Sequence, residues 1–177
     1  MAKMFDDIKK IDGKIEALNR RFSKKRGEID NNRMLSSLGK QKAKNDLMSD
    51  YQAEISPLRR ERETAINERR GYLRDIAFRP KLNTASDQMN YDRLLSDMQK
   101  TDLSKAVSTV SSEVTARAIA RTAFDKGAVK VLNEVKERFP NIAADVDRLE
   151  EFETSVGSRR RMTDMMTEAF SSFVVNK

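Results

Sequence analysis

The sequence predicts an all-α protein, with a long N-terminal helical hairpin followed by a smaller bundle of shorter helices. Two observations predict this class. The 177 residues include only 6 Gly and 3 Pro, while charged residues make up 36% and aromatic residues 6%, a composition typical of helical proteins. In addition, apolar residues recur at steps of three and four along the first eighty residues, which is the spacing of one helix face.

The first helix is predicted from a heptad pattern near the N-terminus. Its apolar residues alternate at steps of four and three, as in a coiled coil, and only Lys25 is polar in this register. A lone helix of this length is marginal in water, so it needs a partner helix from the same chain or from another copy. The apolar positions, called the seam below, are Met4, Ile8, Ile11, Ile15, Leu18, Phe22 and Ile29.

The second helix is predicted over residues 40–78, after a polar break that includes Gly39. Its apolar residues again recur at threes, fours and sevens. Pro57 either opens a fresh helix capped by Ser56 or kinks a continuous one. The simplest arrangement folds the two long helices into an antiparallel, coiled-coil-like hairpin that forms a basic domain of residues 1–80.

Residues 81–177 are predicted to form a charge-neutral helical bundle that ends in an amphipathic helix. Pro80 ends the second long helix, and turn-forming residues separate the shorter helices that follow. One segment is rich in Ala, Ser and Thr, which let helices approach closely, so we expect it to lie centrally. The expected helices span residues 87–99, 103–126 (the Ala-rich segment), 128–139, 142–156 and 158–175.

The excess positive charge lies in the first half of the chain. Residues 1–80 hold 20 Lys and Arg against 13 Asp and Glu, whereas residues 81–177 hold 15 of each, so the hairpin carries the whole net charge of +7. The densest cationic stretch is a candidate contact for a polyanion such as nucleic acid, or equally the solvated face of a helix. Its residues are Arg20, Arg21, Lys24, Lys25 and Arg26.

The residue types present argue against an enzyme. The chain has neither Cys nor His, which excludes thiolate chemistry and the commonest general base at neutral pH, and it has no phosphate-binding glycine loop. Neighbouring carboxylates, such as Asp145 and Asp147, lie in stretches patterned like solvated helix faces. We therefore predict no catalytic residues, no cofactor and no metal ligands.

The last predicted helix carries a broad apolar stripe behind three arginines. The stripe either closes the C-terminal bundle or docks in the groove of a partner protein, where flexible Met side chains adapt to the surface. We do not expect membrane binding, because Asp164 and Glu168 dilute the positive face of this helix. The candidate docking residues are Met162, Met165, Met166, Phe170 and Phe173.

Two stretches of the chain resemble, in style, small helical structural and assembly proteins of bacteriophages, such as scaffolding or internal virion proteins. They are LSSLGKQKAKNDLMSDYQAEISPLRRERETAINERRGYLRDI and the final amphipathic helix. Scaffolding proteins of this style often end in a basic capsid-binding element, whereas the surplus charge here lies at the front. The resemblance implies a non-enzymatic protein that associates with itself, as a homo-oligomer, or with a larger virion assembly.

Two other functions remain open from the residues. The basic hairpin suits a nucleic-acid-binding module, and the helical surfaces suit a regulator that occupies the surface of a partner protein. No secretory segment and no membrane span is visible in the sequence, so we expect a soluble chain that is cytoplasmic at synthesis. The phage resemblance would further imply association with the virion.

Overall fold

The computed structural model is all-α in the part of the chain that it describes, which is residues 2–175 for the backbone and 7–158 for the side chains. This confirms the predicted all-α class. The helices are α1 (Ala2–Asn31), α2 (Ser37–Phe78), α3 (Ala85–Lys100), α4 (Leu103–Thr109), α5 (Glu113–Lys126), α6 (Val129–Arg138) and α7 (Pro140–Val175). They form two compact units, unit 1 (Met1–Arg69) and unit 2 (Arg70–Lys177), and α2 contributes residues to both.

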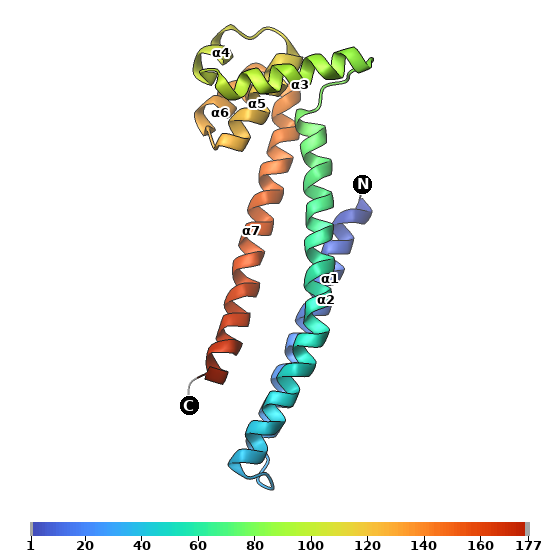
Figure 1. Ribbon diagram of the computed structural model, residues 1–177, viewed down its shortest axis with the longest axis vertical. Helices are drawn as coiled ribbons and strands as arrows, with labels where there is room; N and C mark the ends of the chain where they lie inside the picture. Colours follow the sequence, from blue (N-terminus) through green and yellow to red (C-terminus); the bar gives the residue numbers. More distant parts are fainter. Residues whose placement is uncertain (1, 176–177) are drawn as a thin grey trace. The chain divides into compact units, whose positions relative to one another are not determined.

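In unit 1, α1 lies alongside the first part of α2, and a short turn joins the two helices (Figure 1). The rings of Phe22 and Tyr51 have centroids 4.6 Å apart. Nearer the start of α1, Asp12 pairs with Arg62, which lies further along α2. Residues with lower numbers on α1 therefore contact residues with higher numbers on α2, which means that the two helices run antiparallel.

α2 is continuous through Pro57. Of the two predicted possibilities, a fresh helix capped by Ser56 is therefore wrong. Ser56 lies inside the helix, where its hydroxyl donates a 2.7 Å hydrogen bond to the carbonyl of Gln52. Such bonding back to the preceding turn is a common way for Ser to fit within a helix, and it leaves the hydroxyl satisfied.

Within unit 2, α5 packs against α3, α4 and α6, while α6 also contacts α4 and α7. The centre of α5 is buried, and small residues dominate it, as expected for a helix that its neighbours approach closely. Gly127 ends α5 in the left-handed conformation (φ 66°), and its N–H reaches the last carbonyls of the helix. The buried residues of α5 are Ala116, Arg117, Ala118, Ile119, Ala120, Thr122 and Ala123.

The single helix predicted over residues 103–126 is wrong, because the segment forms two helices, α4 and α5, with a break at residues 110–112. Arg138 supplies a physical reason. Its guanidinium donates hydrogen bonds to the carbonyls of Val107 and Val110, the second at 3.0 Å. These bonds satisfy carbonyl groups that would otherwise lose their partners where α4 ends.

The break predicted at Gly157–Ser158 is also wrong, because α7 runs without interruption from Pro140 to Val175. Glycine inside a helix costs only about 1 kcal/mol relative to Ala, which the rest of the helix can offset. Ser158 does not cap a new helix. Its hydroxyl donates a 2.9 Å hydrogen bond to the carbonyl of Thr154, one turn earlier.

The C-terminal end of α2 is held by side chains from α3 and α5. Arg117 donates to the carbonyls of Ile76 and Ala77 at 2.9 and 2.8 Å, and the Tyr91 hydroxyl donates to the carbonyl of Phe78 at 2.6 Å. These last carbonyls have no partner within the helix, so the three bonds complete it. This anchoring gives a reason why the compact units divide within α2, after Arg69, whereas the sequence places the domain boundary after residue 80.

Candidate interaction surface of the helical arm

The seam of α1 is buried within a single chain. Five of its residues have side chains that are 4–8% exposed, namely Ile8, Ile11, Ile15, Leu18 and Phe22. Ile29 is half-buried, and the side chain of Met4 lies outside the described residues. On α2, Tyr51, Ile55 and Ile66 are also buried. The apolar surface that needs a partner helix is therefore covered without a second copy of the chain.

An ion pair between a buried arginine and a half-buried aspartate fixes the register of this helix pair. Arg62 on α2 is 8% exposed, and its Nε lies 2.6 Å from Oδ1 of Asp12 on α1. Nη2 of Arg62 is buried without a hydrogen-bond partner among the described residues. Because a buried charge is costly without its partner, the pair favours the one alignment of α1 and α2 that brings the two groups together.

The sequence analysis missed this pair, although a signal is present. Tyr51, Ile55 and Leu58 continue a four–three register along α2 that next falls on Arg62. An arginine at a seam position predicts a carboxylate opposite it, and Asp12 directly follows the seam residue Ile11. Reading α2 in the same register as α1 would have found both partners.

A second polar contact between α1 and α2, which together form the helical arm, lies beside the rings of Phe22 and Tyr51. The hydroxyl of Tyr51 donates a 2.7 Å hydrogen bond to Oδ1 of Asn19. Burial raises the pKa of the Tyr51 phenol above its ordinary value of 10.0, while Arg59 opposes the shift. The phenol therefore stays neutral near pH 7 and remains a hydrogen-bond donor, which links α1 and α2 at this level.

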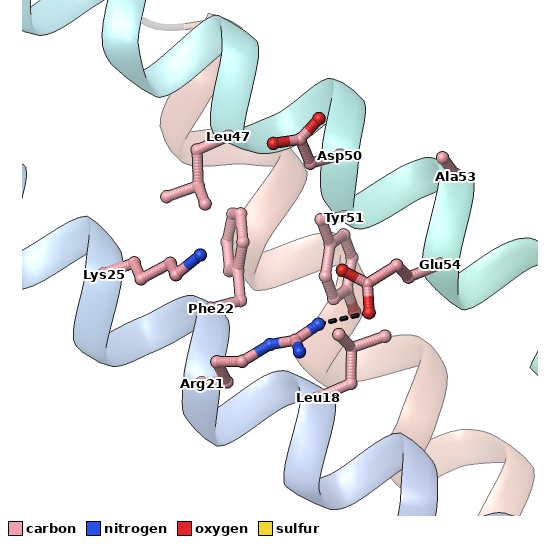
Figure 2. Close-up of a pocket in the computed structure, with 9 residues that line it drawn as sticks. All are labelled: Leu18, Arg21, Phe22, Lys25, Leu47, Asp50, Tyr51, Ala53 and Glu54. Atoms are coloured by element: carbon pink, nitrogen blue, oxygen red, sulfur yellow. Dashed lines mark hydrogen bonds and ion pairs between the residues drawn. The ribbon is translucent and has the colours of Figure 1, made fainter.

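Figure 2 shows a pocket of about 210 Å³ between α1 and α2 at the same level. Phe22 and Tyr51 form its inner wall, while Arg21 and Glu54 pair across its edge. Charged side chains of both signs line the opening, so the pocket has no strong preference for an anion or a cation. Its lining residues are Leu18, Arg21, Phe22, Lys25, Leu47, Asp50, Tyr51, Ala53 and Glu54.

The five candidate polyanion contacts do not all face solvent alike. Arg20 pairs with Glu16 at 2.9 Å, and Arg21 pairs with Glu54 on α2. Lys24 and Lys25 are exposed, and Arg26 is half-buried. The stretch itself holds no carboxylate, but the fold brings one from each helix to its first two arginines. Lys24 and Lys25 are therefore the more accessible cations of this stretch.

The carboxylates of unit 2 that the sequence analysis weighed lie in ion pairs. Lys136 contacts both Asp147 and Glu150, and the hydrogen bond that the Lys136 amine donates to Asp147 is the main cause that raises the pKa of Lys136 above 10.5. Asp145 lies 3.6 Å from Arg148 and 3.9 Å from Arg117. Each of these carboxylates therefore has a cationic partner within unit 2.

Among the described residues, no group of Asp and Glu is arranged to hold a metal ion. In the same part of the chain, no helix combines the length and apolar character needed to cross a bilayer. The candidate docking residues of the final helix, Met162, Met165, Met166, Phe170 and Phe173, have side chains outside the described residues.

The turn between α1 and α2 and the start of α2 present two apolar side chains that the seam pattern does not include. Met34 is 92% exposed and Leu38 is 80% exposed. Neither lies in the register of the seam, so periodicity gives no signal for them.

Comparison of the chain with protein-family models, with curated proteins and with solved structures finds no match.

Proposed function

We infer that the chain is a non-enzymatic structural or assembly protein. In this proposal, residues 1–80 act as a basic helical hairpin arm, and residues 81–177 act as a smaller bundle of shorter helices that docks on a larger assembly. The chain would be cytoplasmic at synthesis and would then join the assembly, which the phage resemblance suggests is a virion.

The burial of the seam within one chain carries the proposal. A pair of antiparallel helices encloses one line of side chains from each helix, such as the line from Ile8 to Phe22 on α1, and leaves most of its other side chains in contact with water. Such an arm offers a large outer surface relative to its core, and this geometry suits contact with partner proteins. Because the seam is already covered, self-association would use the outer faces or the final helix.

The mass of the intact chain in solution tests this function. Light scattering coupled to size exclusion, across a wide range of protein concentration, should show species larger than the 20.3 kDa chain. Nuclease treatment should leave their mass unchanged. A monomer at every concentration would contradict self-association, and a stable one-to-one complex with a single foreign protein would instead favour a regulator.

A second candidate function is binding of nucleic acid, which the exposure of Lys24 and Lys25 favours. Non-specific contacts with phosphates release counterions, so affinity for duplex DNA should fall steeply as salt rises. The variant Lys24→Gln/Lys25→Gln should weaken binding. It should also reduce the slope of log affinity against log salt concentration by the equivalent of about two phosphate contacts. Its matched control is Lys9→Gln/Lys10→Gln, which removes two exposed cations from the same helix. Equal loss in both variants would show that general charge, not this site, governs binding.

A further inference from the structure

The turn that joins α1 to α2, residues 32–36, and the first two turns of α2 form the tip of the arm. Met34 and Leu38 are the two most exposed large apolar side chains in the described residues, at 92% and 80%. A single exposed apolar residue on the surface of a protein needs no explanation, but Met34 in the turn and Leu38 at the start of α2 protrude four residues apart and form a small convex apolar site.

Hydrogen bonds give the tip a defined shape. The backbone N–H of Asn32 donates to the carbonyl of Ile29 at 3.3 Å, and the N–H of Met34 donates to Oδ1 of Asn32 at 2.9 Å. The N–H of Gly39 donates to the hydroxyl of Ser36 at 3.1 Å, which caps the start of α2. These three bonds hold the backbone of the tip in one local conformation.

The tip is also the part of the arm where cations occur without acids. Residues 31–45 hold four Lys and Arg and no Asp or Glu. Arg33 and Lys42 are exposed. The nearest preceding carboxylate, that of Asp30, is paired with Lys44, and Lys40 donates to the carbonyl of Asp30 at 2.7 Å. The charge that the tip offers to an approaching surface is therefore positive.

We propose that the tip of the arm docks on the surface of an anionic lipid bilayer, with Met34 and Leu38 entering the interface and Arg33 and Lys42 contacting the headgroups. Arg33 precedes Met34 directly, and Lys42 follows Leu38 by four residues on α2, so exposed cations accompany both apolar side chains. This combination matches a bilayer surface, which is apolar beneath a layer of negative charge. A protein groove would need a shape complementary to this convex site. Nucleic acid would use the cations but would gain little from Met34 and Leu38, which cannot stack on bases as aromatic rings do.

This inference goes beyond the proposed assembly function. It also differs from the expectation, drawn from the sequence, that the chain does not bind membranes; that expectation rested on the final helix and on the lack of a membrane span, and it did not weigh the tip. The two ideas are compatible, because a membrane contact at the tip leaves unit 2 available for protein partners.

Tryptophan fluorescence tests the insertion directly, since the chain contains no Trp. The variant Met34→Trp places the only indole of the chain at the tip, and Met89→Trp is the matched control, because Met89 on α3 is also exposed, at 73%. With vesicles of phosphatidylcholine and about one-third phosphatidylserine, the emission of the Met34→Trp variant should shift to the blue. Vesicles of phosphatidylcholine alone should cause no shift, and the Met89→Trp variant should show none with either lipid.

Vesicle sedimentation measures the contribution of each side chain in the full chain. Met34→Ser/Leu38→Ser should lower the partition coefficient by about tenfold or more. Arg33→Gln/Lys42→Gln should lower it by roughly 25-fold, since each cation near an anionic surface contributes about fivefold. Lys130→Gln, at an exposed cation of α6, serves as the control and should bind like the parent protein. All of these positions are exposed, so circular dichroism should show unchanged helix content.

Three results would overturn the proposal. They are an emission spectrum of the Met34→Trp variant that anionic vesicles leave unshifted, equal blue shifts in the two Trp variants, and vesicle binding that the double variants at the tip do not weaken. Binding of the tip to duplex DNA, with loss of affinity in Arg33→Gln/Lys42→Gln but not in Met34→Ser/Leu38→Ser, would assign the cations to nucleic acid instead.

Discussion

Truncating Ile55 should selectively destabilise the arm. The Ile55 side chain is fully buried on α2 within unit 1, so Ile55→Ala removes packed methyl groups and leaves a cavity. Such truncations cost about 2–5 kcal/mol, and the higher helix propensity of Ala returns roughly 0.5 kcal/mol. We therefore expect the free energy of unfolding of unit 1 to fall by about 3 kcal/mol, a large fraction of the stability of a small unit.

Hydrogen exchange read by mass spectrometry localises this loss. Protection of amides in α1 and in α2 before Arg69 should fall by about a hundredfold in Ile55→Ala, since each 1.4 kcal/mol is a factor of ten. Leu38→Ala is the matched control, because it removes a similar side chain from the same helix at a position that is 80% exposed. Its effect should stay within about 0.5 kcal/mol. Similar losses in both variants would refute the assignment of Ile55 to the core of the arm.

Three further outcomes follow from contacts within each unit. Asp12→Ala should cost about 2–4 kcal/mol because it leaves the Arg62 charge buried, while Asp12→Ala/Arg62→Met should recover most of that loss in urea titrations. Arg117→Met should cost about 2–3 kcal/mol and increase hydrogen exchange in the last turn of α2, whose carbonyls lose their donor. Asp147 holds the pKa of Lys136 above 10.5 in the folded protein. The charged amine therefore contributes its whole stabilisation below pH 10.5 and loses it as the pH rises through the raised pKa. Lys136→Met should reduce the fall in melting temperature over this alkaline range.

The parts of the fold that follow from the sequence are those that periodicity and turn residues govern. The steps of three and four from Ile8 to Phe22 predict one buried helix face, because an apolar stripe gains free energy only when it is covered. The all-α class is confirmed, and α2 ends at Phe78, just before Pro80, as the turn residues indicate.

The remaining features depend on contacts between residues far apart in the chain. The break between α4 and α5 coincides with the hydrogen bonds from Arg138, which lies 28 residues after Val110. α7 continues through Gly157 because one weak position does not end a long helix. Periodicity does not predict the exposure of Met34, which lies in a turn, or of Leu38, which lies at the start of α2 and outside the register of its buried residues. Local sequence therefore predicts the helices better than their interruptions and their exposed tips.

The distance between α1 and α2 within one molecule tests the central claim most directly. Ala17→Cys/Ala53→Cys places two spin labels at exposed sites, and the chain has no other Cys. Antiparallel helices pack about 8–10 Å apart, so the label separation should lie below about 25 Å and should persist when labelled protein is diluted with unlabelled protein. Two results would contradict a seam closed within one chain. One is a separation near about 50 Å, as expected for one extended helix at about 1.5 Å per residue. The other is a short distance that disappears when the labelled protein is diluted.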